Sequence, residues 1–192
     1  MPERAADDIP TDDPRPKELR RAPSLVLVNT GPGKGKTSAA VGVIVRAIGR
    51  GWPVGVVQFL KSGNWKTGEE KVCRDLGVDW WTEGEGFTWD SDDLDRDQAK
   101  AASAWDLAER VIAAGDHQLV VLDEITYPVN WGWVTVDRVV RAITERPEHV
   151  NVVITGRNAP AELIDIADTV SEIGVVKHAY QSGIRAKKGI DF

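Results

Sequence analysis

Cysteine, histidine and long apolar runs are scarce in this sequence. It has one cysteine, three histidines and no uninterrupted hydrophobic stretch of the length that spans a bilayer. The single Cys73 excludes an internal disulfide framework and a cysteine-based metal cluster, and we expect it to be a minor core residue rather than a nucleophile. No basic segment followed by an apolar one stands at the N-terminus, so the sequence predicts no secretory signal, no membrane partner and, by default, a cytoplasmic location.

Basic residues are also fewer than acidic ones: the sequence has 24 lysines and arginines and 30 aspartates and glutamates, which gives a net charge of −6. Bulk binding of nucleic acid needs a concentrated basic face, so nucleic acid is not an expected partner. Basic side chains do gather near the C-terminus, where their spacing is equally compatible with a solvated tail and with a contact surface for an anionic ligand. They are Lys177, His178, Arg185, Lys187 and Lys188.

The most informative segment is a glycine-rich turn between the strand-like run 24–29 and a helical pattern that begins at Lys36. Glycines let backbone N–H groups converge on an anion, and the helix N-terminus adds a favourable dipole. Lys36 would bring positive charge to phosphates, and Thr37 would offer a hydroxyl to Mg²⁺. The one departure from the usual pattern is Thr30, where glycine is expected. The turn predicts a nucleoside triphosphate site with these residues: Thr30, Gly31, Gly33, Lys34, Gly35, Lys36, Thr37 and Ser38.

Strand-like and helical segments alternate along most of the chain. We expect strands at 25–29, 54–59, 78–81, 119–122, 152–155 and 169–175, and helices at 36–50, 69–76, 92–114, 136–145 and 160–167. This predicts an α/β fold: a single P-loop NTPase-like (RecA-like) domain with a mostly parallel sheet of about six strands and helices on both faces. Residues 1–22 are rich in Pro, Asp, Glu and Arg, so we expect a flexible N-terminal arm before a domain that covers 23–192.

Two carboxylates, Asp123 and Glu124, end the apolar run that begins at Leu119. Ligands of parallel sheets bind beyond the C-terminal ends of the strands, so these carboxylates should lie near the phosphate loop and hold or orient Mg²⁺. Arg157 follows another strand and could reach phosphate or purine, although a plain surface arginine fits its position nearly as well. These residues leave open a phosphoryl-transfer kinase, an NTPase switch or motor, and an enzyme that uses the nucleotide in another way.

Two large aromatic residues, Phe87 and Trp89, stand in a glycine-flanked loop before a charged helix. Such a pair can line the face of a flat apolar ligand, or it can anchor the loop into the core. The residues alone slightly favour the second interpretation, in which the aromatic side chains anchor the loop into the core.

The chain resembles a known family, the P-loop type ATP:cob(I)alamin (corrinoid) adenosyltransferases. The resemblance runs from about residue 25 to 192, and Thr30 in place of the first glycine is usual in that family. It rests on ordered segments rather than on one motif. They are the phosphate loop from Thr30 to Thr37, Val56-Val57-Gln58-Phe59-Leu60-Lys61, Gly86-Phe87-Thr88-Trp89, Val121-Leu122-Asp123-Glu124, Ile154-Thr155-Gly156-Arg157, Ala167-Asp168-Thr169-Val170-Ser171-Glu172, Val176-Lys177-His178 and Gly189-Ile190-Asp191-Phe192.

The resemblance implies that cobalt(I) of a reduced corrinoid attacks the 5′ carbon of ATP and that triphosphate leaves. It implies Thr37 and Glu124 as Mg²⁺ ligands with Asp123 as a supporting neighbour, and Lys36 as a residue that stabilises the leaving group. Phe87 and Trp89 would crowd the lower corrin face and displace the lower axial ligand. A flavoprotein reductase and a homodimer are also implied.

Two features depart from the family pattern. Pro32 stands where many members carry asparagine. In the family a helical N-terminal segment can cover the active site, whereas the N-terminal arm here is short and contains prolines. A kinase or NTPase acting on another small molecule, a RecA-like nucleic-acid module and a nucleotide-binding regulator remain the alternatives.

Overall fold

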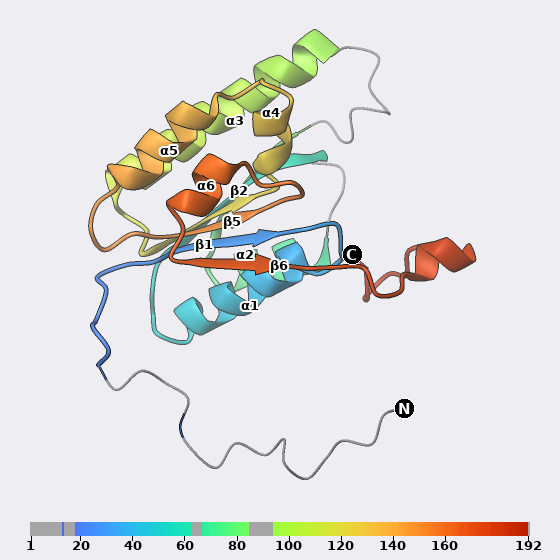
Figure 1. Ribbon diagram of the computed structural model, residues 1–192, viewed down its shortest axis with the longest axis horizontal. Coiled ribbons are helices and arrows are strands. Elements are labelled where there is room, and N and C mark those ends of the chain that lie inside the picture. The colour runs from blue at the N-terminus through green and yellow to red at the C-terminus, as the bar shows by residue number, and fades with distance from the viewer. Residues whose placement is uncertain (1–12, 14–17, 63–66, 85–93, 192) are drawn as a thin grey trace.

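The computed structural model describes residue 13 and residues 18–62, 67–84 and 94–191. Their strands form a six-stranded sheet in which every pairing is parallel, with the order β3-β2-β4-β5-β1-β6 (Figure 1). The predicted α/β class is therefore confirmed. The strands are β1 (Val26–Thr30), β2 (Val54–Ser62), β3 (Asp79–Gly84), β4 (Leu119–Asp123), β5 (Asn151–Thr155) and β6 (Thr169–Glu172).

Helices cover both faces of this sheet, with α3, α5 and α6 on one side and α1 on the other (Figure 1). The five helices expected from the sequence are all present, whereas α4 and the short 3₁₀-helix η3 were not expected. The expected strand 169–175 ends earlier, at Glu172. The helices are α1 (Lys36–Ile48), α2 (Gly68–Asp75), α3 (Leu94–Ala114), α4 (Thr126–Asn130), α5 (Val136–Thr144), α6 (Ala161–Asp165) and η3 (Ala179–Ser182).

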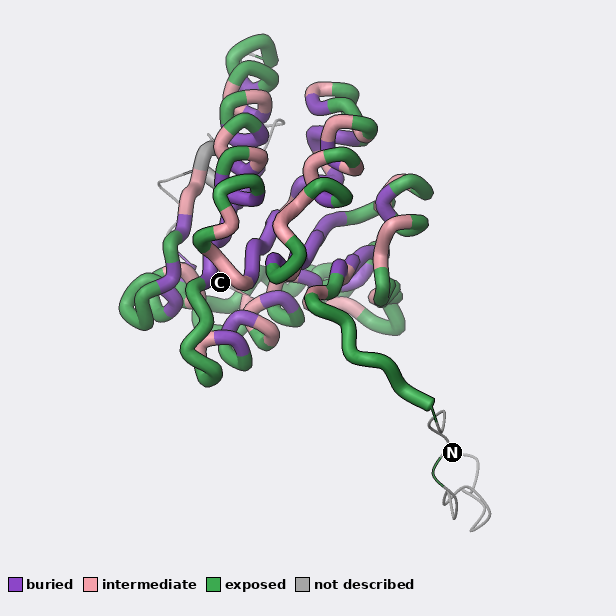
Figure 2. The backbone as a smooth tube through the Cα atoms, turned by 90° about the vertical axis from the view of Figure 1, so that its left-hand side faces the viewer, coloured by how far each residue is buried: buried purple, intermediate pink, exposed green. Residues whose placement is uncertain are grey.

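Alternate residues of the central strands serve two separate cores. In β4, Val120 and Leu122 pack toward α3 and α5, whereas Leu119 and Val121 pack toward α1 and α2. Side chains of a strand point alternately to the two faces, so a strand covered on both faces reads as a continuous apolar run. Figure 2 shows the resulting buried strands between helices whose outer surfaces are exposed.

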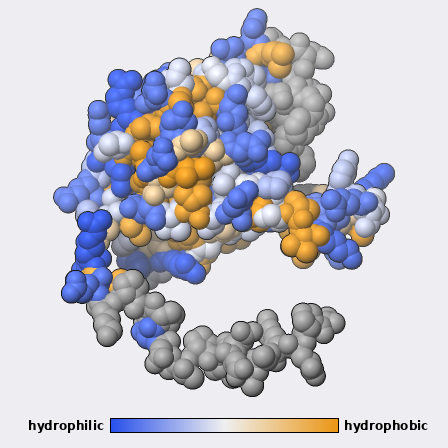
Figure 3. All heavy atoms as spheres, viewed as in Figure 1, coloured by the Kyte–Doolittle hydropathy of each residue, from blue (hydrophilic) through white to orange (hydrophobic). Residues whose placement is uncertain are grey.

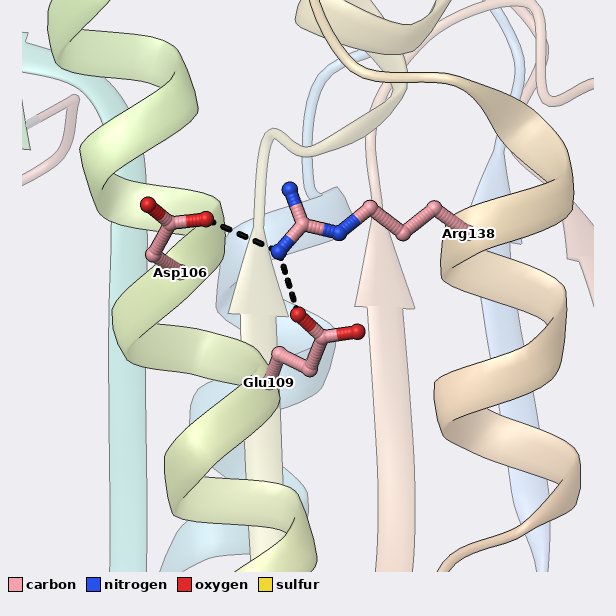
Figure 4. A network of polar contacts seen from close by, with 3 residues as sticks. All are labelled: Asp106, Glu109 and Arg138. Carbon is pink, nitrogen blue, oxygen red and sulfur yellow. Dashed lines mark hydrogen bonds and ion pairs between the residues drawn. The ribbon is translucent and has the colours of Figure 1, made fainter.

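Arg138 of α5 connects that helix to α3, which lies on the same face of the sheet (Figure 4). Its guanidinium donates to Asp106 Oδ1 of α3 at 2.8 Å and to Glu109 Oε2 of the same helix. These hydrogen bonds raise the pKa of Arg138 above its ordinary value. The three side chains are partly exposed, so we expect the network to fix the pairing of α3 with α5 more than to add stability.

The C-terminal edge of the sheet carries the residues of interest, because β1 leads directly into the phosphate loop and β4 and β5 end beside it. Among the described residues, no helix is long and apolar enough to cross a membrane.

Candidate functional site

The phosphate loop lies between β1 and the first turn of α1, as the sequence predicts. Gly31 and Gly35 have φ angles of 94° and 120°, in the left-handed region that favours glycine. Gly33 donates its N–H to Ile173 O at 2.6 Å, and a Cβ at this position would overlap with Gly174 O. The glycines therefore let the loop turn tightly and lie directly against the segment that follows β6.

Thr30, the departure from the usual pattern, has a structural role. Its hydroxyl accepts a hydrogen bond of 3.1 Å from Ala159 N, in the loop between β5 and α6. A glycine could not make this contact, so Thr30 connects the phosphate loop to the loop that carries Arg157.

Lys36 lies buried across the loop and donates from Nζ to Gly31 O at 2.9 Å and to Gly33 O at 2.6 Å. Burial lowers the pKa of this ammonium below its ordinary value, and the charge of Arg157 adds to the effect. The charges of Glu124 and Asp123 act in the opposite direction. Lys36 is thus held inside the predicted phosphate cradle, close to both acidic residues.

Asp123 is a fully buried carboxylate that accepts three hydrogen bonds. Thr37 donates to Oδ1 at 2.9 Å, Thr155 donates to Oδ1 at 2.7 Å, and Gln58 donates from Nε2 to Oδ2 at 2.7 Å. The donors come from α1, β5 and β2, so Asp123 joins three elements at the centre of the site. Its oxygens are occupied by protein donors, which suits a supporting role better than direct binding of a metal.

Thr37 and Glu124 offer oxygen atoms beside this network. The Thr37 hydroxyl uses its single proton on Asp123, so its lone pairs can face a cation. Glu124 has a φ of 66°, unusual for a residue other than glycine, and its N–H donates to Thr155 Oγ1 at 2.9 Å. This turn places the Glu124 side chain near Lys36 and Tyr127, whose pKa values its charge affects.

Arg157 is exposed, and α4 holds its backbone in place. Thr126 Oγ1 donates to Arg157 O at 2.7 Å, and Asn130 Nδ2 donates to Asn158 O at 3.0 Å. Gly156 has a φ of 143°, and a Cβ there would overlap with Thr126 Oγ1. The loop and α4 therefore fit together only with glycine at this position.

The C-terminal segment also reaches the phosphate loop. Lys34 Nζ forms an ion pair of 2.7 Å with Asp191 Oδ1, and Asp191 Oδ2 accepts from Lys187 N at 2.6 Å. These contacts lower the pKa of Asp191, the backbone hydrogen bond more than Lys34. Beside them lies a pocket of about 300 Å³, lined by Ser38, Val41, Gly68, Glu69, Gly189, Ile190 and Asp191.

The structure thus gathers the predicted phosphate-loop residues with Asp123 and Glu124, and it places Arg157 close enough for its charge to act on Lys36. Phe87 and Trp89 lie outside the described residues. Sequence reasoning assigned no site role to five residues that the structure brings into this region: Gln58, Thr126, Asn130, Thr155 and Asp191. Gln58 could have been found from the sequence, because it lies inside the apolar run 54–60 and a buried amide needs polar partners.

Cys73 is buried in the core beside α1, as expected for a structural cysteine. Burial raises the pKa of its thiol, and the charge of Glu69 raises it further. A thiol with a raised pKa is a poor nucleophile at neutral pH.

The donor set at the phosphate loop fits Mg²⁺ better than a transition metal. No group of three or more His, Cys, Asp or Glu residues suited to a metal is found in the described part of the chain. Mg²⁺ needs no such cage, because one or two carboxylates, waters and the phosphates of a substrate complete its octahedron. The Thr37 hydroxyl and the Glu124 carboxylate agree with that requirement.

Comparison with known proteins identifies the family. A family model described as ATP:corrinoid adenosyltransferase BtuR/CobO/CobP matches residues 22–192. A corrinoid adenosyltransferase of Pseudomonas aeruginosa is 45% identical over 182 residues, which cover 94% of this chain and 89% of that protein. The corrinoid adenosyltransferase of Escherichia coli (strain K12) and the corrinoid adenosyltransferase CobA of Salmonella typhimurium are each 41% identical over 180 residues, with 94% of this chain and 91% of the relative covered. The chain therefore belongs to the BtuR/CobO/CobP family of ATP:corrinoid adenosyltransferases and is a transferase that uses ATP to adenosylate corrinoids.

Proposed function

We propose that the protein transfers the 5′-deoxyadenosyl group of ATP to cobalt(I) of a reduced corrinoid and releases triphosphate. The electron pair of cobalt(I) forms the bond to carbon 5′, and the electron pair of the broken carbon–oxygen bond leaves with the triphosphate. The observation that carries the proposal is the network on Asp123, which holds Thr37 of the phosphate loop beside the strand end that bears Glu124. The site binds the triphosphate and leaves the chemistry to the reduced metal of the substrate.

Lys36 and the loop amides stabilise the negative charge that develops on the triphosphate. The N-terminus of α1 points its free N–H groups at the same place, so these donors are already oriented before the reaction. Thr30, Gly31, Gly33, Lys34, Gly35 and Ser38 complete the proposed nucleotide site, and Arg157 adds a positive charge at its margin.

Mg²⁺ would be held by the Thr37 hydroxyl and the Glu124 carboxylate, with Asp123 orienting Thr37. A bound Mg²⁺ would neutralise charge on the triphosphate. Glu124 keeps its backbone fixed through Thr155, so its carboxylate stays at the end of β4.

Phe87 and Trp89 are proposed to form the apolar wall below the corrin. Such a wall excludes the lower axial ligand, and cobalt(II) without that ligand is easier to reduce. Replacing Trp89 with alanine should then preserve ATP binding and remove most turnover with a cobalt(II) corrinoid. Unchanged turnover would contradict this role.

A flavoprotein reductase, a homodimer and a cytoplasmic location stay part of the proposal. The proposal also includes a domain at 23–192 and a separate N-terminal arm at 1–22. The dimer has some physical support, because apolar side chains are exposed on the segment after β6 (Figure 3). They include Val176, Tyr180, Ile184 and Ile190. Light scattering during size-exclusion chromatography gives the mass of the particle directly, and a monomer at all concentrations would exclude the dimer.

The reaction is tested by mixing the protein with Mg²⁺, ATP and chemically reduced cobalamin in anaerobic buffer. We expect the spectrum of adenosylcobalamin, its loss in light, and one triphosphate for each turnover. Release of ADP and phosphate without a spectral change would instead indicate a kinase or NTPase.

Two lysine variants test whether the phosphate loop carries this reaction. Lys36→Ala should abolish most turnover because the leaving group loses its charge partner. Lys71→Ala removes an exposed lysine of α2 and should leave turnover at the wild-type level. Equal activity of the two variants would contradict the assigned role of Lys36.

A further inference from the structure

Three aromatic side chains form a row along α4 and the loop after it. The ring centroids of Tyr127 and Trp131 are 5.7 Å apart, and those of Trp131 and Trp133 are 4.8 Å apart. Trp131 is 39% exposed, and the other two are partly exposed. None of the three belongs to either hydrophobic core of the described residues, so core packing does not account for them.

This aromatic row begins at the edge of the nucleotide site. Tyr127 lies three residues after Glu124, and burial together with the charge of Glu124 raises the pKa of its hydroxyl, with Arg157 acting in the opposite sense. The hydrogen bonds of Thr126 and Asn130 fix α4 to the loop of Arg157. The row therefore has a fixed position next to two proposed site residues.

The geometry of the rings is poorly matched to a single purine. Neighbouring rings are tilted by 50° and 59°, so they offer no pair of parallel faces between which a base would stack. Three rings in a row also extend beyond one base. A corrin macrocycle is wider, and its rim carries methyl groups, methylene groups and carboxamides.

The indole N–H groups match those carboxamides. Neither Trp131 nor Trp133 donates a hydrogen bond from its indole to any residue that the structure describes. Indoles at binding surfaces combine an apolar ring with one donor, which suits a rim that alternates apolar and amide groups.

We propose that Tyr127, Trp131 and Trp133 form a side wall of the corrinoid site, with the indoles of Trp131 and Trp133 contacting the rim of the macrocycle and its carboxamides. The inference rests on the proposed adenosyltransferase reaction. The aromatic row determines affinity for the corrinoid and not for ATP.

Single alanine variants of Trp131 and Trp133 test the wall, and Trp52→Ala is the matched control. Trp52 is 38% exposed and precedes β2, at the edge of the sheet opposite the phosphate loop. We expect the KM for the corrinoid to rise by about tenfold in each test variant, which corresponds to the loss of about 1.4 kcal/mol of binding free energy. The KM for ATP and both constants of Trp52→Ala should stay within about twofold of the wild type.

A binding measurement separates this inference from the reaction itself. Equilibrium dialysis with hydroxocobalamin needs no turnover, so a weaker Kd in the Trp131 and Trp133 variants supports the wall even if the product were not adenosylcobalamin. Absence of adenosylcobalamin from the wild type would contradict the reaction alone.

Two results would overturn the wall. One is an unchanged corrinoid Kd in both variants, and the other is a rise in the KM for ATP with the corrinoid constants unchanged, which would assign the rings to adenine. Trp131→Phe guards against a folding defect, because it keeps an aromatic ring of smaller size and removes the N–H donor, and its corrinoid Kd should lie between those of wild type and Trp131→Ala.

Discussion

Thr30 shows how a single side chain can depart from a motif and strengthen the site. The position lies at the end of β1, and its hydroxyl accepts from Ala159 N, far away in the sequence. The usual glycine would fit the turn but would leave that N–H without its partner. The sequence alone identified the departure and could not identify the partner, because the contact depends on how β1 and β5 pair.

Replacing Thr30 with glycine restores the usual pattern, yet we expect it to weaken the protein. Loss of the hydroxyl should lower the free energy of unfolding by about 1 kcal/mol and weaken ATP binding, since the loop of Arg157 loses an attachment. Urea unfolding and calorimetric titration with ATP measure the two effects. Thr30→Ser keeps the hydroxyl and should behave as the wild type; a Thr30→Gly protein as stable as the wild type would show that the contact contributes nothing.

The environment of Lys36 predicts that ATP binding depends on pH. Its pKa is lowered by burial and by Arg157, so the ammonium loses its proton below the ordinary value of a lysine. As pH rises through the lowered pKa, the positive charge disappears and the Kd for ATP should increase. A bound triphosphate favours the charged lysine, so ATP binding in that range should take up a proton.

Calorimetric titrations from about pH 7 to about pH 10, in buffers of different ionisation enthalpy, measure both the Kd and the proton uptake. Lys36→Met should lose the dependence and bind ATP weakly throughout. Lys71→Met should follow the wild-type curve. If the affinity of Lys36→Met for ATP fell at alkaline pH as it does in the wild type, the pH dependence would belong to another group.

At the scale of elements, local pattern predicted the long helices and the buried strands well. The turn into α1 was recognisable because its chemistry is encoded in adjacent residues. The helix α4 was not expected: it has five residues, contains Pro128, and is held by hydrogen bonds from Thr126 and Asn130 to a distant loop. No periodicity in so short a segment can report contacts of that kind.

The close contact between α4 and the β5–α6 loop predicts that a substitution at Gly156 strongly lowers stability. Gly156→Ala would force a methyl group onto Thr126 at a φ of 143°, so we expect the unfolding free energy to fall by about 2 kcal/mol or more. Gly42 supplies a control of opposite sign, since it lies in α1 with open space around it. Gly42→Ala should stabilise by up to about 1 kcal/mol. Thermal unfolding of the two variants tests the contrast, and a neutral Gly156→Ala would mean that α4 moves freely against the loop.

Across the whole molecule, Asp123 connects elements that the sequence separates widely. Its three donors come from α1, β2 and β5, and the sheet register places Gln58 directly beside it. The carboxylate itself was recognised from the end of an apolar run. Its donors were not, because the order β2-β4-β5 had to be known first.

Asp123→Asn should therefore lower global stability as well as activity. The NH₂ group of the asparagine would replace a carboxylate oxygen that accepts a hydrogen bond, so it would face a hydroxyl or amide donor. We expect this to lower the free energy of unfolding by about 2–3 kcal/mol. Asp165→Asn alters an exposed aspartate of α6 and should stay within about 0.5 kcal/mol of the wild type. The urea midpoint should shift without a change in slope, and equal midpoints for the two variants would contradict the role of Asp123 in holding the sheet together.

The strand order has a consequence for biosynthesis. β1 pairs only with β5 and β6, so the strand that bears the phosphate loop emerges from the ribosome long before its partners do. At roughly 5–20 residues per second, β1 waits on the order of ten seconds with both edges open, while β2, β3 and β4 can already pair. A nascent chain therefore builds one half of its sheet first, and its capacity to retain ATP arises as the last strands are inserted.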